Sequence, residues 1–260
     1  MTQPRTQRLN PQIVRLSPTA VDTWSTCRRR YLLRHILGIP SSDSTLSGDE
    51  GLRLHAVMRF IHDNGRCDNN AFVHEVLLGH ECDTDTMRSM IARHRDRCPQ
   101  RSARGKHEIE RARYHHQPGP MFLATARLDA VWIHDGIFDI RDYKTGRIAP
   151  MDLRDDVRAH LQAWVFAPRA AAMGLRLRIR YEYLAPEAGD DPDAWEVDDE
   201  DLERIESGLR NTVLAIQHEA FEGIAQPTVC GYCSYRSVCS ESATPSVAQW
   251  PALAVDTTAW

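Results

Sequence analysis

The chain has 260 residues, of which 42% are hydrophobic, 26% charged and 7% aromatic, so its composition is that of an ordinary globular protein and not of a disordered, collagen-like or fibrous one. Its formal net charge of −4 excludes a protein that is a polycation over its whole surface. The 32 basic residues are unevenly divided, because only Lys106 and Lys144 are lysines and the other 30 are arginines. Each retained lysine is therefore a candidate for chemistry that a guanidinium does not perform.

The N-terminal segment gives the first indication of the compartment. Residues 1–16 are polar and contain arginines, so they lack the apolar centre of a signal peptide, and we expect a cytoplasmic protein. No segment approaches the roughly 18 apolar residues of a membrane helix, and we expect no membrane contact. The seven cysteines are odd in number and unevenly spaced, which argues against a disulfide framework. The thiols are then either inert or metal ligands.

In chain order, the periodicity predicts helices first, then strands, then helices again. After a leader, Ser17 is a helix N-cap with Pro18 in the first turn, and this helix is expected to continue to Leu37. The later elements that we expect are a linker over 38–47, helices over 49–62 and within 70–97, strands over 107–116, 121–134 and 137–144, a helix over 151–173, a strand over 175–184, a solvated acidic loop over 190–201, and a helix ending near 221.

This order of elements predicts an α/β (α+β) fold, with a small mixed sheet flanked by helices. We expect a single domain over residues 17–240. It would consist of a helical part (about 17–100), a sheet core (about 105–185) and a C-terminal helix with a cysteine-rich segment (about 199–240). Residues 1–16 would form a flexible leader, and residues 241–260, which are rich in Pro, Ser and Thr, a mobile tail.

The clearest local signal is a β-hairpin with Asp135-Gly136 as its two-residue turn. Residues at equal distances from this turn are expected to pair, so Asp129 should face Asp142 and Arg127 should face Lys144. These two pairs share one face of the hairpin with apolar pairs nearer the turn. The predicted face is therefore apolar near the turn and acidic further from it.

Two opposed carboxylates have Cβ atoms about 4.5–5.5 Å apart, where like charges are destabilising. Mg²⁺ or Mn²⁺ would offset the charge of Asp129 and Asp142, since both ions bind oxygen ligands. The alternative is a pair of carboxylates at a solvent-exposed strand edge, neutralised only by Arg127 and Lys144. The apolar run on the same face and the scarcity of lysine favour a metal site.

Asp129 together with Asp142-Tyr143-Lys144, followed by Thr-Gly, resembles the core motif of the PD-(D/E)XK nucleases, in the RecB-like branch. The order and spacing of the motifs are similar over residues 17–240. The resemblance implies a restriction-endonuclease-like core and a metal-dependent nuclease.

Three further motifs of this branch have counterparts in the chain. Gly51-Leu-Arg-Leu-His55 is similar to its Gly-x-x-x-His motif, and Ala126-Arg-Leu-Asp129 resembles its Gly-x-x-Asp motif with Ala in place of Gly. Gln162-Ala-Trp-Val-Phe166 resembles its Gln-x-x-x-Tyr motif, with Phe in place of Tyr. The second departure removes a hydroxyl group that would contact substrate.

The resemblance implies a role for each matching residue. The metal would be held by His55, Asp129, Asp142 and the backbone carbonyl of Tyr143. Lys144 would orient or help to deprotonate the attacking water, and Gln162 completes the implied catalytic set. Either Glu108 or Glu110 would assist as an outer acid, with an exposed strand face as the alternative reading of both.

A second cluster of candidate ligands is Cys230-x2-Cys233-x5-Cys239, which supplies three thiolates, with Cys27 as the natural fourth. This spacing resembles the iron–sulfur members of the same branch, found in AddB-type subunits and in the Cas-four type of CRISPR adaptation nuclease. The resemblance implies a structural [4Fe–4S] cluster that ties the N-terminal helix to the C-terminus. Zinc held by the same four thiolates is the alternative. The remaining cysteines are expected to be ordinary thiols: Cys67, Cys82 and Cys98.

With a net charge of −4, any DNA contact has to be local. Arg28, Arg29 and Arg30, beside Trp24 and Tyr31, could hold phosphates and stack a base. The alternative is a solvated helix face with the two aromatic rings in the core.

Three functions from different classes fit the sequence. The first is a Mg²⁺- or Mn²⁺-dependent DNA exonuclease acting on single strands or free ends, in repair, recombination or CRISPR adaptation, with a helicase or adaptation protein as partner. The second is a DNA-binding or helicase-partner module that keeps the fold and the cluster without turnover, which Phe166 favours. The third is an iron–sulfur electron carrier. We expect the first.

Overall fold

The computed structural model describes residues 13–41, 46–99, 106–109, 114–116, 122–146 and 152–243. Most of the expected leader (1–12) and tail (244–260), and Glu110, lie outside these residues. None of the described helices is long and apolar enough to cross a membrane. The helices are α1 (Pro18–Thr26), α2 (Arg28–Tyr31), α3 (Leu46–Asp63), α4 (Asn70–Gly79), α5 (Asp85–Arg95), α6 (Val157–Ala172), α7 (Asp199–Gln217) and α8 (Pro227–Cys230).

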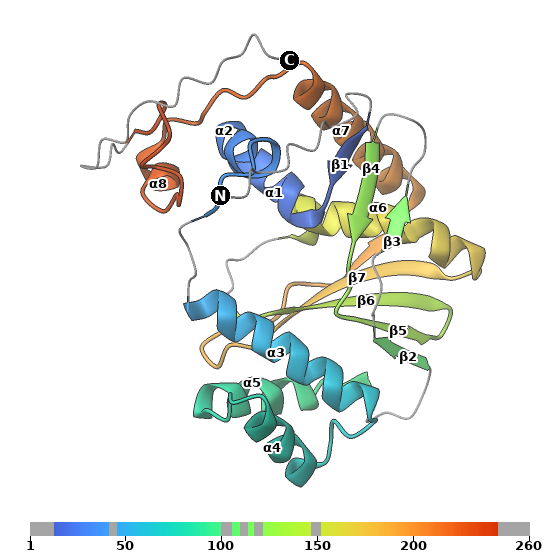
Figure 1. The fold of residues 1–260 in the computed structure, drawn as a ribbon. Coiled ribbons are helices and arrows are strands. Elements are labelled where there is room, and N and C mark those ends of the chain that lie inside the picture. Colours follow the sequence, from blue (N-terminus) through green and yellow to red (C-terminus); the bar gives the residue numbers. More distant parts are fainter. Residues whose placement is uncertain are drawn as a thin grey trace, which may run out of the picture.

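The larger sheet of the described residues has five strands in the order β2-β5-β6-β7-β8. Strands β6 and β7 are parallel and are connected through α6, whereas the other neighbours are antiparallel. The sheet lies between α6 on one side and α3, α4 and α5 on the other (Figure 1). The strands are β2 (Lys106–Ile109), β5 (Ala130–His134), β6 (Ile137–Lys144), β7 (Arg176–Tyr183) and β8 (Trp195–Val197).

A smaller sheet has the order β1-β4-β3, formed by Val14–Leu16, Phe122–Ala126 and Tyr114–His116. The expected continuous strands over 107–116 and 121–134 were therefore wrong, because each contributes one strand to each sheet. The second break falls at 127–129, where Leu128 turns into the core and is only 2% exposed. The apolar pattern runs on through this break, so it gives no sign that the chain changes sheets.

The hairpin register is confirmed from His134–Ile137 to Ala130–Arg141. Asp135 and Gly136 both have positive φ, 47° and 74°, as a two-residue hairpin turn requires. The ladder ends one pair short of Asp129–Asp142, because β5 begins at Ala130. The expected pair of Arg127 with Lys144 is also not formed: Arg127 is exposed, and Lys144 pairs with Tyr183 of β7 instead.

The expected N-terminal helix begins as predicted, with the Ser17 hydroxyl accepting a hydrogen bond from the Ala20 N–H over 3.2 Å. It does not continue unbroken to Leu37, because Cys27 is extended (φ −166°) and separates α1 from α2. A π-helical turn over Leu32–Ile36 follows α2. The acidic segment over 190–201 is also more ordered than expected, since it contains β8.

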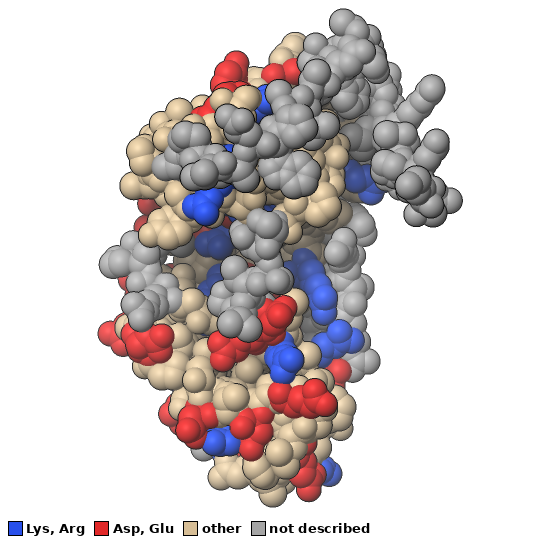
Figure 2. Space-filling model, turned by 60° about the vertical axis from the view of Figure 1, so that its left-hand side comes forward, with Lys and Arg blue, Asp and Glu red and all other residues tan. Residues whose placement is uncertain are grey.

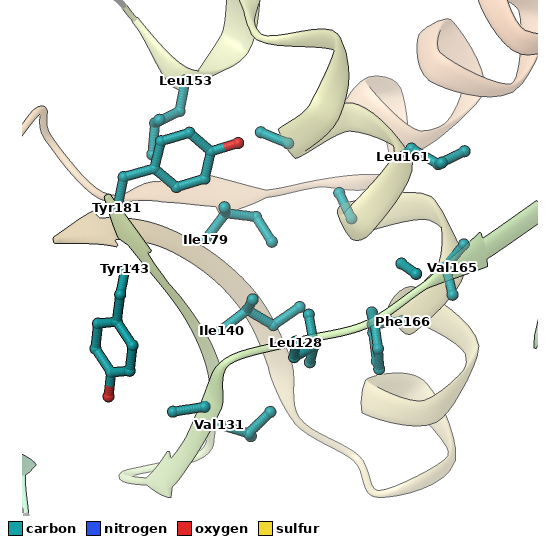
Figure 3. Packing of buried hydrophobic residues seen from close by; sticks show 14 of the residues in the cluster. Leu128, Val131, Ile140, Tyr143, Leu153, Leu161, Val165, Phe166, Ile179 and Tyr181 are labelled. Atoms are coloured by element: carbon teal, nitrogen blue, oxygen red, sulfur yellow. The ribbon is translucent and has the colours of Figure 1, made fainter. Parts of the chain in front are cut away.

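The core between the sheet and α6 determines where the end of β6 lies. Phe138, Ile140, Ile179, Leu161 and Phe166 are all fully buried, and each contributes about 1.5–3 kcal/mol by its burial. Figure 3 shows Ile140, Ile179, Leu161 and Phe166 in this core. The rings of Phe138 and Phe166 stack with centroids 6.4 Å apart. Strand β6 is therefore packed on this face up to Ile140, two residues before Asp142.

Strand alternation separates the side chains of β6 onto two faces. Asp142 and Tyr181 are neighbours in register, and so are Tyr143 and Glu182. Figure 3 shows the rings of Tyr143 and Tyr181 on opposite sides of the sheet. Asp142 and Lys144 therefore lie on the α6 side, while Tyr143 and Glu182 lie on the side of α3 and α5.

Candidate functional site

Two carboxylates lie where the apolar core ends at the C-terminal part of β6. Asp142 belongs to β6, and Asp129 lies in the bend just before β5. The backbone N–H of Tyr143 donates to Asp129 Oδ2 over 2.8 Å, which holds Asp129 beside the residue that follows Asp142. Burial raises the pKa of Asp129, and the negative charge of Asp142 raises it further. The site therefore brings like charges together in a partly buried place.

Lysine and glutamine side chains hold the second carboxylate. Lys144 Nζ lies 2.9 Å from Asp142 Oδ1, and Gln162 Nε2 of α6 donates to Asp142 Oδ2 over 2.8 Å. The Lys144 ammonium also lies 4.1 Å from the centre of the Tyr181 ring. Burial raises the pKa of Asp142, but Lys144 and Gln162 outweigh burial and hold it below its ordinary value. The two aspartates are thus differentiated by their neighbours.

Helix α3 brings His55 to the first carboxylate, with Nδ1 3.0 Å from Asp129 Oδ1. Burial lowers the pKa of His55, but Asp129 and the charge of Asp142 outweigh it, so that the pKa lies above the ordinary 6.5. Gly51 lies one turn earlier on α3, and a Cβ there would be 3.4 Å from Thr145 Oγ1. Helix α3 therefore passes close to the segment that follows Lys144.

The donor groups fit a hard divalent cation: two carboxylates, one imidazole and the carbonyl group of Tyr143. Their like charges and partial burial already require a positive group, which His55 and Lys144 supply in part. The donors do not converge into one tight group. Among the described residues, the one group of three or more His, Cys, Asp or Glu side chains whose ligand atoms all lie within 4.8 Å of one another is at a different place, and it is described below.

A model of the PD-(D/E)XK nuclease superfamily matches residues 15–240. The chain belongs to this superfamily. The mixed α/β fold with a small sheet flanked by helices agrees with this assignment and confirms the expected fold class.

The chain is also similar in fold to a solved structure. The crystal structure named “Putative exonuclease” from Eubacterium rectale has a TM-score of 0.51 at 12% identity, over 98% of this chain and 96% of that chain. At this identity the likeness concerns the fold alone. A second structure, SSO0001, has a TM-score of only 0.38 at 13% identity, over 84% of this chain and 96% of that chain. No curated protein matches the sequence.

In this superfamily member, Gln162 and Phe166 of the Gln-x-x-x-Tyr-like motif have different surroundings. Gln162 is 3% exposed and reaches Asp142, and its Oε1 is buried without a hydrogen-bond partner among the described residues. Phe166 is fully buried and stacks on Phe138, so it does not face the carboxylates. The missing tyrosine hydroxyl would therefore lie in the core.

The four cysteines of the expected cluster line one small cavity between α1–α2 and the C-terminal segment. Cys27 and Cys230 are buried, and Cys233 and Cys239 are half-buried. Arg30 lines the same cavity. The four cysteines therefore lie together although Cys27 is about 200 residues from the other three.

The expected nucleic-acid contacts are only partly accessible. Tyr31 is 2% exposed and packs edge-on against Trp24 with centroids 5.3 Å apart, so no base can stack on it in this structure. Arg29 forms an ion pair with Glu241 at 3.6 Å. Arg28 is exposed, and its guanidinium lies 5.2 Å from the centre of the Trp24 ring. The alternative in which the aromatic rings belong to the core is the one observed.

Sequence reasoning missed a second group of metal-ligating side chains. Cys67 and Cys98 are not isolated thiols as expected, because they lie with His62 and His94 in one buried group. The signal was present in the paired spacings His62-x4-Cys67 and His94-x3-Cys98.

The raised pKa of His55 predicts how metal binding depends on pH. A protonated imidazole cannot bind a cation, and a raised pKa keeps His55 protonated to a higher pH. We expect the affinity for Mn²⁺ to rise between pH 6 and 8, measured by calorimetric titration at a series of pH values. His55→Ala should bind Mn²⁺ more weakly and lose most of this dependence, while His74→Ala on α4 should keep it. A wild-type affinity that is constant over this range would contradict the assignment of His55.

Proposed function

We propose that the chain is a metal-dependent DNA exonuclease of the RecB-like branch, acting on single-stranded DNA or free ends in repair, recombination or CRISPR adaptation. One observation carries the proposal: side chains from four separate elements meet at the end of β6. His55 comes from α3, Asp129 from the bend before β5, Asp142 and Lys144 from β6, and Gln162 from α6. Folding alone does not require a half-buried lysine, histidine and two carboxylates to lie together there.

Asp129, Asp142, His55 and the carbonyl of Tyr143 would hold Mg²⁺ or Mn²⁺. Such an ion lowers the pKa of a bound water and offsets the charge on the scissile phosphate. The protein's own contribution is to fix these donors before substrate arrives. Gln162 and the Tyr143 N–H each occupy one carboxylate oxygen, so each aspartate is held in a single orientation.

Lys144 is the residue that we propose to orient the attacking water and to offset charge as the phosphodiester bond breaks. Its ammonium is confined between the Asp142 carboxylate and the face of Tyr181. An ammonium is compact and can exchange protons, whereas a guanidinium is planar, larger and permanently charged. This difference explains why a chain so rich in arginine keeps lysine here.

The alternative is a DNA-binding module that keeps the nuclease fold but does not cleave DNA. It rests on Phe166, and the position of this residue weakens it. Because Phe166 is fully buried beside Phe138, its lack of a hydroxyl removes nothing from the exposed side of Asp142 and Lys144. The acidic pair, the lysine and the glutamine are all present. We therefore favour an active enzyme over a DNA-binding module.

We further propose that Cys27, Cys230, Cys233 and Cys239 hold a structural [4Fe–4S] cluster. The four cysteines line one small cavity together with Arg30 and Arg236, whose positive charges would offset the negative charge of a cluster bound by four thiolates. Zinc held by the same four thiolates is the alternative.

For DNA, the exposed Arg28 is the basic residue of α2 that remains available for a phosphate. Figure 2 shows basic side chains recessed in the middle of the molecule, and acidic side chains lower, at the level of α3, α4 and α5. This local charge separation supports DNA binding along the middle of the molecule despite the net charge of −4. A helicase or an adaptation protein would be the partner.

The test of catalysis is the pair Lys144→Arg and Lys144→Ala. Both should reduce degradation of labelled linear single-stranded DNA in Mn²⁺ by at least about 100-fold, because both remove the amine that orients water. Lys106→Arg exchanges the other lysine, on the edge strand β2, and should keep full activity. Degradation of circular single-stranded DNA at the same rate as linear DNA would contradict an exonuclease. Cleavage by Lys144→Arg at the wild-type rate would contradict the role of the lysine.

The cluster is tested by metal analysis of protein purified without oxygen. We expect about four iron and four sulfide per chain, with a brown colour. Cys27→Ser should lose the iron and melt at a lower temperature, because the link between the N- and C-terminal segments is broken. Cys82→Ser, which alters a buried cysteine elsewhere, is the matched control. Colourless wild-type protein without iron would refute the cluster.

A further inference from the structure

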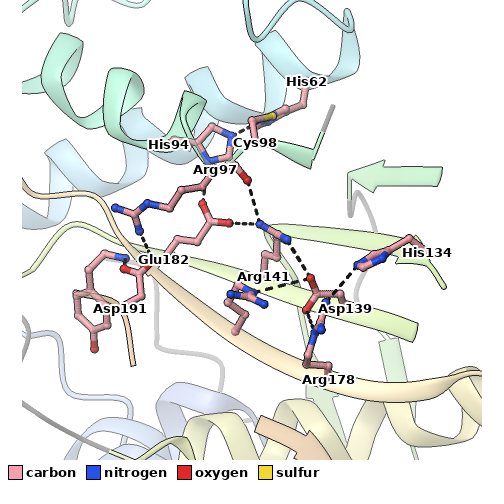
Figure 4. Close-up of polar contacts among 12 residues, drawn as sticks. His62, His94, Arg97, Cys98, His134, Asp139, Arg141, Arg178, Glu182 and Asp191 are labelled. Atoms are coloured by element: carbon pink, nitrogen blue, oxygen red, sulfur yellow. Dashed lines mark hydrogen bonds and ion pairs between the residues drawn. The ribbon is translucent and has the colours of Figure 1, made fainter. Parts of the chain in front are cut away.

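Four side chains outside the proposed nuclease centre converge in a buried group between α3, α5 and the sheet. They come from the last turn of α3, the loop after it, the last turn of α5 and the residues just beyond α5. Their ligand atoms all lie within 4.8 Å of one another. The members are His62, Cys67, His94 and Cys98, which are exposed by 4%, 1%, 0% and 4%. Figure 4 shows His62, His94 and Cys98.

The distances within the group match the edges of a metal-binding tetrahedron. His94 Nε2 lies 2.9 Å from His62 Nε2, and His62 Nε2 lies 3.4 Å from Cys98 Sγ. Around zinc, with bonds of about 2.0–2.1 Å to nitrogen and 2.3 Å to sulfur, the corresponding edges are about 3.3 and 3.6 Å. Small outward shifts of these side chains would therefore make room for one ion.

A carboxylate behind the group orients one of the imidazoles. Glu182 Oε2 lies 2.8 Å from His94 Nδ1, and both side chains are fully buried. When Nδ1 carries the proton and donates it to Glu182, the Nε2 lone pair of His94 faces the other three side chains. Metal-bound histidines regularly have such a carboxylate partner. Arg141 holds Glu182 in turn, with its Nη1 2.5 Å from Oε1 (Figure 4).

The chemistry of the donors selects the ion. Two thiolates and two neutral imidazoles, with no oxygen among the four, are borderline-soft ligands that suit zinc and not Mg²⁺ or Ca²⁺. Four protein ligands leave no open position, which is the arrangement of a structural site. Complete burial leaves no path for a substrate.

We propose that His62, Cys67, His94 and Cys98 bind a structural Zn²⁺ that closes the segment 62–98 and links the end of α3 to the end of α5. The zinc site does not depend on the proposed cleavage reaction. The effect of the zinc site on cleavage rests on the proposed function. His55 lies two turns before His62 on α3, and the ring centroids of His62 and His94 lie 6.4 and 5.1 Å from that of Tyr143. The ion would thus stabilise the positions of α3 and of β6, the helix and the strand that carry His55 and Asp142.

The decisive measurement is zinc content and zinc X-ray absorption of the full-length wild-type chain, purified without oxygen. We expect about one zinc per chain, surrounded by two sulfur and two nitrogen atoms. Zinc with four sulfur ligands would place the ion at the Cys27 cluster and overturn the proposal. So would protein without zinc, or a Cys67–Cys98 disulfide found by mass spectrometry. These outcomes do not depend on nuclease activity.

Variants assign the ligands. Cys67→Ser and Cys98→Ser should each lose the zinc, whereas Cys82→Ser, a buried cysteine between α4 and α5, should keep it. Because loss of a ligand can also prevent folding, Glu182→Gln provides a test that leaves all four ligands in place. Its zinc affinity, measured by competition with a chelator, should fall about 10- to 100-fold. Retention of full zinc content by Cys67→Ser would contradict the site.

Discussion

The repulsion between Asp129 and Asp142 is the constraint around which the end of β6 is organised. The packed core beneath Phe138 and Ile140 fixes where Asp142 emerges, and a hydrogen bond from the next backbone N–H fixes Asp129 beside it. Two negative charges so placed are unfavourable unless positive charge is near. The surrounding groups each offset part of this cost, while burial and the charge of Asp142 still raise the pKa of Asp129. Strain of this kind at a functional site is commonly tolerated because the rest of the fold is stable.

The two faces of the larger sheet carry different kinds of side chain near the end of β6. On the α6 face, apolar side chains give way to Asp142 and Lys144. On the opposite face, a series of ion pairs and hydrogen bonds links His94 to Glu182, Arg141, Asp139, Arg178 and His134 (Figure 4). Buried charges of this kind are retained where their partners are complete. Tyr143, between Asp142 and Lys144, joins the two faces, so that each of them influences the position of the same short stretch of β6.

Much of the central hairpin could be read from the sequence because local chemistry determines it. The Asp135-Gly136 turn sets the register, and every observed pair followed from it. The end of the ladder could not be read, since β6 continues by pairing with β7, which lies about 30 residues later in the chain. The exchange between sheets at 127–129 was hidden for a related reason: Leu128 is apolar like its neighbours, and only tertiary packing makes it turn.

The site residues show the same division between local and distant determinants. Gln162 and His55 were placed by resemblance, and the geometry brings both to the carboxylates. Tyr31 was misjudged as a DNA contact because an aromatic ring next to arginines has the same pattern whether it faces the core or solvent. Cys67 and Cys98 were misjudged because their partners are histidines about 30 residues apart, which converge only where the ends of α3 and α5 meet in the fold.

The central claim is that the paired carboxylates need a cation, and the most direct test compares the thermal unfolding of wild type and Asp129→Asn with and without added Mn²⁺. Without Mn²⁺, the variant should melt at the same temperature as wild type or higher, because it loses one of two repelling charges. With Mn²⁺, wild type should gain stability and the variant should gain little, while Asp152→Asn at the exposed Asp152 should behave as wild type. Equal stabilisation of wild type and Asp129→Asn by Mn²⁺, or a variant that is less stable than wild type without it, would contradict the account.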